Sequence, residues 1–136
     1  MDDEGHLTER GRDAAREMAG DDGVARFEAV HEGWAQEVDP DLARIFTDFT
    51  TNGMYARTVL PFDTRELCAV AALTVLQRDE QLRAHISLAL RANPPEVVRE
   101  VIVQMAMYGG FPVTLSALEV LKGVLAQADQ APDAVD

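Results

Sequence analysis

The residues best suited to acid–base chemistry in this chain are Glu66 and His85, which fall in two consecutive predicted helices. An imidazole gives or takes a proton near neutral pH, and a neighbouring carboxylate can hold it in place or share its proton. Apolar residues recur around His85 with helical spacing, so its side chain belongs to the apolar face of its helix. Glu66 falls in the first turn of the preceding helix. Whether the two groups meet within one chain depends on how these helices pack, and the sequence leaves that open.

Each of these residues also has a purely structural explanation. The segment 63–66 (DTRE) fits a capping box, in which Glu66 would reach back to the start of its own helix. His85 could be a core histidine whose ring nitrogens are satisfied by neighbours. The other histidines, His6 and His31, are expected in the N-terminal tail and on a helix surface. Because no HxxxH or HxH pattern occurs, we predict no metal site.

Composition limits the classes of function that are open to the chain. Its 136 residues, 47% of them hydrophobic, suffice for one domain with a real core. The net charge of −12, from 24 acidic and 12 basic residues, argues against nucleic acid and anionic membranes as partners. A small anionic substrate would need a local cluster of arginines. The single cysteine, Cys68, excludes an intrachain disulfide and a dithiol pair, and we expect it to be a small core residue.

The N-terminal residues are charged throughout and contain no apolar segment of the kind that a signal peptide requires. The longest apolar stretch is interrupted by Arg78, Asp79 and Glu80, so we expect no membrane-spanning helix. These features predict a cytoplasmic protein.

Helical periodicity organises the whole chain, and no segment alternates apolar and polar residues over the length of a strand. Residues 1–20 are expected to form an N-terminal arm or a short helix, with Thr8 as its cap and Gly20 as its stop. Residues 21–127 are predicted to be a single helical domain. Residues 128–136 are rich in Ala, Asp, Gln and Pro and are predicted to be a disordered tail.

Cap residues and apolar spacing predict an all-α fold of about six helices. Asp39-Pro40 is a strong helix start, because aspartate caps a helix and proline fits its first position. Asn93 and Glu96 are predicted to form a capping box for a later helix. Residues 64–76 carry apolar side chains all round, which is typical of a fully buried helix. The expected buried faces of two early helices are Val24, Phe27, Val30, Trp34 and Val38, and Leu42, Ile45, Phe46 and Phe49.

The later helices carry more apolar side chains than one buried face of each helix would contain. So much surplus apolar surface on a small acidic chain favours a homo-oligomer that assembles through helical faces. The residues outside the main faces are Leu88, Val103, Met107, Val120 and Val124.

Three stretches, 65–73 (RELCAVAAL), 82–86 (LRAHI) and 96–118 (EVVREVIVQMAMYGGFPVTLSAL), together resemble the carboxymuconolactone decarboxylase family, a relative of the AhpD-type alkyl hydroperoxidases. The resemblance runs over roughly residues 40–126. It implies the AhpD-like helical fold. Three parts are specific when taken together: the spacing of Glu66 and His85, the series Glu96, Arg99, Glu100 and Val101, and the series Gln104, Tyr108, Gly109, Gly110 and Pro112.

The resemblance also separates the branches of this family. In the peroxidase branch a Cys-x-x-Cys precedes the histidine, and those two positions are Arg78 and Gln81 here, so dithiol peroxide reduction is chemically closed. The decarboxylase branch keeps the glutamate and the histidine without the cysteines. It implies homo-trimers or homo-hexamers that act without a metal or organic cofactor. The family's Trp-x-Arg-Pro-Gly segment differs here, because Tyr55 replaces the tryptophan and Thr58-Val59 the Pro-Gly.

The resemblance suggests a role for each candidate residue. In such a decarboxylation Arg57 would grip a substrate carboxylate bidentately, His85 would protonate carbon, and Glu66 would hold the imidazolium. Tyr55 and Tyr108 are candidate donors to the enolate, and Gln104 is a further substrate-binding candidate.

Three functions remain open. The first is a cofactor-free lyase that acts on a small carboxylated lactone or a related enolisable acid. The second is a relative recruited to a biosynthetic pathway, where the same pair moves protons in an isomerisation, cyclisation or dehydration of an aromatic or polyketide-like substrate. The third is a non-catalytic oligomeric scaffold, in which Glu66 and His85 serve only capping and packing.

Overall fold

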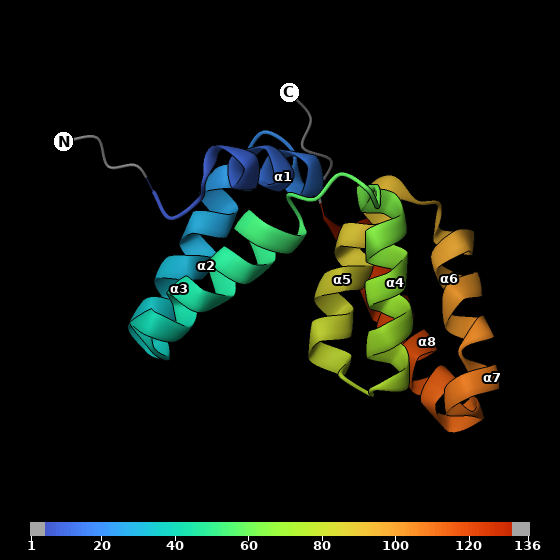
Figure 1. The fold of residues 1–136 in the computed structure, drawn as a ribbon. Helices are drawn as coiled ribbons and strands as arrows, with labels where there is room; N and C mark the ends of the chain where they lie inside the picture. The colour runs from blue at the N-terminus through green and yellow to red at the C-terminus, as the bar shows by residue number, and fades with distance from the viewer. Residues whose placement is uncertain (1–4, 132–136) are drawn as a thin grey trace. The chain divides into compact units, whose positions relative to one another are not determined.

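A computed structural model describes residues 5–131, which fold as two compact units that divide between Phe62 and Asp63 (Figure 1). All regular structure in the described residues is helical, which confirms the predicted all-α fold. The range predicted as one domain, residues 21–127, has residues in both units.

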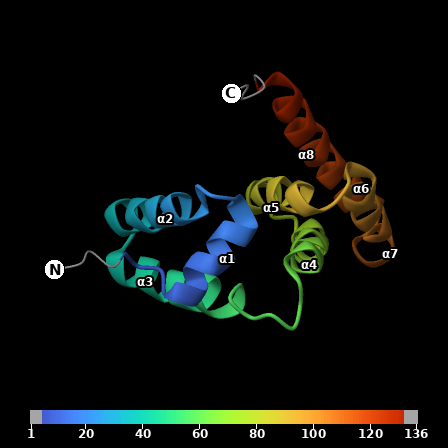
Figure 2. The ribbon, with the colours of Figure 1, turned by 90° about the horizontal axis from the view of Figure 1, so that it is seen from above.

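The described residues of the first unit form three α-helices and a π-helical turn. The helices α2 and α3 pack side by side, and α1 lies across one end of the pair (Figures 1 and 2). Thr8 accepts a hydrogen bond from the backbone N–H of Gly11, and Asp39 accepts one from Leu42, so both predicted N-caps are confirmed. The elements are α1 (Glu9–Ala19), α2 (Gly23–Glu37), α3 (Pro40–Phe49) and η1 (Thr50–Met54).

Small residues, not the predicted large ones, fill the interface of α3 in this unit. Ala43 and Thr47 are its buried residues, while the predicted stripe of Leu42, Ile45, Phe46 and Phe49 is exposed. Trp34, predicted in the core, is 39% exposed and packs on Phe46. The reason is close helix packing. At Gly23, for example, an added Cβ would collide with the backbone of Ala15, so the helices approach where side chains are smallest.

The second unit is a bundle in which α5, α6 and α7 all pack on α8 (Figure 1). Val120 and Val124, predicted outside the main faces, lie in its core, so that prediction was wrong. The elements are α4 (Phe62–Val75), whose first residue belongs to the first unit, α5 (Asp79–Ala92), α6 (Pro95–Gln104), α7 (Ala106–Gly109) and α8 (Phe111–Gln130). The core residues are Val70, Leu82, Ile86, Ala89, Val98, Ile102, Ala117, Val120, Leu121 and Val124.

Helix α4 is buried along one stripe only, so the prediction of burial on every side was wrong for the single chain. Its buried residues recur every four positions, which is one face of a helix. Cys68 faces solvent rather than the core, and Leu76 is 62% exposed. The apolar pattern of residues 64–76 therefore exceeds what one chain covers. The buried residues are Phe62, Glu66, Val70 and Thr74.

Helix α8 extends through Gln130, so the predicted disordered tail was wrong at residues 128–130; residues 132–136 lie outside the described residues. The helix stops where Ala131 becomes extended, immediately before Pro132, as sterics before a proline require. By length and composition α8 would also pass as a membrane-spanning helix, contrary to the sequence expectation. That test is weak evidence, because core helices pass it too and α8 contributes Leu121 to the core.

Candidate active site

Glu66 and His85 meet in the second unit. The Nδ1 atom of His85, on α5, lies 2.8 Å from the Oε2 atom of Glu66, on α4. The Glu66 side chain is completely buried, whereas 28% of the His85 side chain is exposed. The meeting that the sequence left open therefore occurs within a single chain.

The start of α4 removes the capping-box explanation for Glu66. The helix begins at Phe62, so its third position, where a capping-box glutamate belongs, is occupied by Thr64. Asp63 lies inside the helix and accepts a hydrogen bond from the backbone N–H of Thr64 at 2.6 Å. Glu66 is instead directed inward, towards the imidazole.

Asn93 ties the end of α5 to the start of α4. Its Nδ2 donates to the backbone oxygen of Ala89 at 3.0 Å and to that of Asp63 at 3.2 Å. Asn93 therefore caps the end of α5, and Pro94 occupies the N-cap of α6 that was predicted for Asn93. This link holds together the two helices that carry Glu66 and His85.

The surroundings of the pair are apolar on the buried side and open on the other. Leu82 and Ile86, one turn before and one residue after His85, are fully buried, as is Val70, one turn after Glu66. In such surroundings a carboxylate is costly unless it is paired, so the contact to His85 matters energetically. Within residues 5–131 the Nε2 atom of His85 has no hydrogen-bond partner, which leaves it available to a ligand.

The other predicted site residues are divided between the two units. Tyr55 and Arg57 lie in the first unit, directly after η1. Gln104 ends α6 and Tyr108 lies in α7, both exposed, and in the described part of the chain neither hydrogen-bonds to Glu66 or His85. The structure thus brings together Glu66 and His85, and the joint site with the other four stays a prediction.

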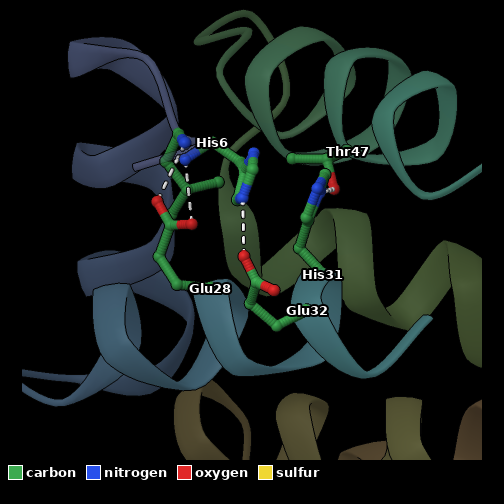
Figure 3. Close-up of polar contacts among 6 residues, drawn as sticks. His6, Glu28, His31, Glu32 and Thr47 are labelled. Carbon is green, nitrogen blue, oxygen red and sulfur yellow. Dashed lines mark hydrogen bonds and ion pairs between the residues drawn. The ribbon is translucent and has the colours of Figure 1, made fainter. Parts of the chain in front are cut away.

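Sequence reasoning missed a group of interacting polar residues around two stacked histidines in the first unit, called the histidine cluster below (Figure 3). His31 is 5% exposed, and its Nδ1 lies 2.7 Å from the Oγ1 of Thr47. The ring of His6 stacks on it with 3.6 Å between centroids and 14° between planes. Glu32 holds the Nε2 atom of His6 at 2.8 Å. His31 on a helix surface and His6 in a free tail were therefore wrong expectations.

The segment before α1 is held in place by side chains of α2 and η1. Glu28 accepts hydrogen bonds from the backbone N–H groups of His6 and Leu7, both at 2.9 Å (Figure 3). Asn52 accepts from the backbone N–H of Thr8 at 2.9 Å and donates to the backbone oxygen of His6 at 3.0 Å. Across residues 5–131, no group of three or more metal-ligating side chains is arranged to hold an ion. The histidine cluster therefore has a structural explanation, because its polar groups serve to anchor the chain.

Comparisons with known proteins match the part of the sequence that carries Glu66 and His85. Residues 40–123, which include Glu66 and His85, match the sequence model of the carboxymuconolactone decarboxylase family. A 4-carboxymuconolactone decarboxylase of Acinetobacter baylyi is 25% identical over 101 residues, covering 74% of this chain and 75% of that protein. A 15.0 kDa protein of Paracoccus denitrificans, described as uncharacterized and from the nqo9–nqo10 intergenic region, is 35% identical over 79 residues, covering 56% and 59%.

Proposed function

This chain belongs to the carboxymuconolactone decarboxylase family, and from that premise we propose that it is a cofactor-independent decarboxylase acting on a small carboxylated lactone or a related enolisable acid. The observation that carries the proposal is the contact of a buried carboxylate, Glu66, with a partly exposed imidazole, His85. The relative from Acinetobacter baylyi, named as a 4-carboxymuconolactone decarboxylase, supports this reaction class.

The chemistry asks little of the protein. When the bond between the ring and its carboxylate breaks, CO₂ leaves and the electron pair passes into the conjugated lactone carbonyl as an enolate. The substrate is its own electron sink, so no organic cofactor is needed. A proton must then reach carbon, and the reaction consumes one proton for each CO₂ released.

His85 is proposed to deliver that proton from Nε2, since Nδ1 is engaged by Glu66. Glu66 is proposed to hold the imidazole in one orientation through its contact with Nδ1. Arg57 is proposed to bind the substrate carboxylate, with Tyr55, Gln104 and Tyr108 as further contacts to the substrate.

The assembly and location proposed with this function are a cytoplasmic homo-trimer or homo-hexamer. Leu76, directly after α4, and the large side chains Met107 and Phe111 are exposed. They support self-association, since a second copy would bury them. Neither nucleic acid nor membrane is proposed as a partner.

A second function is favoured by the segment from Tyr55 to Val59, where the sequence departs from the family pattern. In this alternative the same Glu66 and His85 transfer protons during isomerisation, cyclisation or dehydration of an aromatic or polyketide-like substrate. No carbon–carbon bond to a carboxylate would break, so no CO₂ would be released.

The test is turnover of 4-carboxymuconolactone by the purified chain, followed by ultraviolet absorbance and by CO₂ release. The diagnostic variant is His85→Gln, whose amide can still donate to Glu66 but cannot protonate carbon. We expect kcat/KM to fall by about 10²- to 10⁴-fold, the usual contribution of a general acid. Glu66→Gln exchanges a charge-assisted hydrogen bond for a neutral one and should cost about tenfold.

The controls are His6→Gln and Glu100→Gln, which change the same residue types at exposed positions that form no hydrogen bond to Glu66 or His85 among the described residues. Both should turn over at the rate of the unchanged chain. If the unchanged chain releases no CO₂, the decarboxylase proposal is wrong. Proton exchange at an enolisable substrate that is lost in His85→Gln would then support the second function, and its absence would support a scaffold.

A further inference from the structure

A groove of about 330 Å³ lies on the second unit between the C-terminal halves of α5 and α8. The groove is more open than enclosed, and its volume is at the lower end of the range for sites that hold small molecules. The floor is apolar, because Val124 is a core residue and Leu90 packs against the core. The lining residues are Ser87, Leu90, Arg91, Val124, Gln127 and Ala128.

Two polar side chains of this groove, those of Arg91 and Gln127, can donate hydrogen bonds to a ligand. Ser87 donates its own hydroxyl to the backbone oxygen of Arg83 at 3.1 Å, so its proton is used. The guanidinium of Arg91 and the side-chain amide of Gln127 have no hydrogen-bond or ion-pair partner among the described residues. Among the described residues, none of the side chains that line the groove is acidic.

A second arginine extends the positive charge along the same face of α5. Arg83, Ser87 and Arg91 follow at intervals of four residues, which places them on one side of the helix. The Nη1 of Arg83 lies against α8 at Gly123, where an added Cβ would come within 3.3 Å of it. Neither arginine forms an ion pair within residues 5–131, although the chain carries 24 acidic residues and only 12 basic ones.

We propose that this α5–α8 groove binds a small amphipathic monocarboxylate, apart from the site of Glu66 and His85. The carboxylate accepts hydrogen bonds from Arg91 and Gln127, and the apolar body of the ligand covers Leu90, Val124 and Ala128. A guanidinium that faces an apolar floor suits such a ligand, because the carboxylate satisfies the donors while the hydrocarbon leaves water.

The probe is sodium octanoate, titrated into the full-length ¹⁵N-labelled chain and followed by amide chemical shifts. We expect saturable shifts at Ser87 and Gln127, with a dissociation constant on the order of 1 mM for so small a ligand. Octanamide, which has the same apolar body and no charge, should bind at least about tenfold more weakly.

Two variants separate binding from the fold. Arg91→Gln should weaken octanoate binding at least about tenfold, and Ala128→Trp, which fills the groove and keeps the charge, should abolish the shifts at Ser87. Arg99→Gln, an exposed arginine of α6, is the matched control and should bind as the unchanged chain does. Because Arg91 also lies in the last turn of α5, thermal unfolding of each variant is measured alongside.

His85→Gln should bind octanoate unchanged, which makes this outcome independent of the decarboxylase proposal. The groove assignment is overturned if octanoate causes no saturable shifts, if octanamide binds equally well, or if Arg91→Gln leaves the affinity unchanged. It is also overturned if binding disappears in His85→Gln, since the ligand would then occupy the other site.

Discussion

Two histidines, one in each unit, show how similar contacts support different conclusions. His31 and His85 both lie in helices, and in both the Nδ1 atom contacts an oxygen at hydrogen-bonding distance, at 2.7 Å from Thr47 and 2.8 Å from Glu66. The partner of His31 is a neutral hydroxyl, while that of His85 is a buried carboxylate. One face of the His31 ring is also covered by His6.

Accessibility completes the contrast. His31 is 5% exposed, so no substrate can reach its ring without local unfolding, whereas 28% of the His85 side chain is open. A titratable group in a dry setting with one open edge can transfer protons to a ligand, and one that is enclosed mainly contributes stability. We therefore propose a chemical role for His85 and a structural one for His31.

The largest expected effect is on catalysis at His85. His85→Gln should lower kcat/KM by about 10²- to 10⁴-fold, while the free energy of unfolding changes by less than about 1 kcal/mol, because the amide still bonds to Glu66. Turnover and urea denaturation, measured on the same preparation, check the expected loss of kcat/KM and the expected small change in the free energy of unfolding. A large loss of stability with intact specific activity would show that His85 has a structural role, as His31 does.

His31→Ala should lower the stability of the first unit and leave turnover unchanged. It deletes a buried ring and leaves the Thr47 hydroxyl buried without that partner, so the first unit should lose about 2–3 kcal/mol of stability. The chain has one tryptophan, Trp34, on α2, so its fluorescence during urea denaturation reports on this unit. Turnover per folded molecule should not change. An unaltered fluorescence midpoint would show that the His31 contact contributes nothing.

Local signals in the sequence predicted the elements well. The caps at Thr8 and Asp39 and the all-helical pattern are confirmed because their interactions join residues a few positions apart. The pairing of Glu66 with His85 could be anticipated only from a resemblance, since spacing alone leaves helix packing open. The geometry then decided against a capping role for Glu66, because α4 begins at Phe62.

Contacts between distant segments could not be predicted. His6 reaches Glu32 across 26 positions and His31 reaches Thr47 across 16, and no periodic pattern encodes such meetings. Burial was also misjudged for Cys68 and Trp34, because apolar periodicity identifies a face suited to contact without naming its partner. In a single chain such faces stay exposed.

A smaller effect tests the close helix packing that leaves large side chains exposed on the surface of the first unit. Gly23→Ala places a methyl group against the backbone of Ala15 and should destabilise this unit by about 1–2 kcal/mol. The matched control in the same helix is Gly33→Ala. There an added Cβ would meet none of the described atoms within 4 Å beyond its own helix backbone and chain neighbours, so this variant should stabilise by up to about 1 kcal/mol. Trp34 fluorescence in urea measures both. Changes of the same sign would contradict the packing explanation.

The smallest expected effect lies in the turn that joins the helices of Glu66 and His85. Gln77 adopts a left-handed conformation with φ of 57°, while the backbone N–H of Arg78 donates to Leu73 at 3.1 Å and closes α4. Glycine reaches this conformation without a Cβ penalty, so Gln77→Gly should stabilise the second unit by about 0.5 kcal/mol after its added freedom in the unfolded chain is counted. Gln81→Gly, inside α5, should instead destabilise by up to about 1 kcal/mol. Thermal unfolding followed by far-ultraviolet circular dichroism measures both, and destabilisation by both variants would show that the turn carries no strain for glycine to relieve.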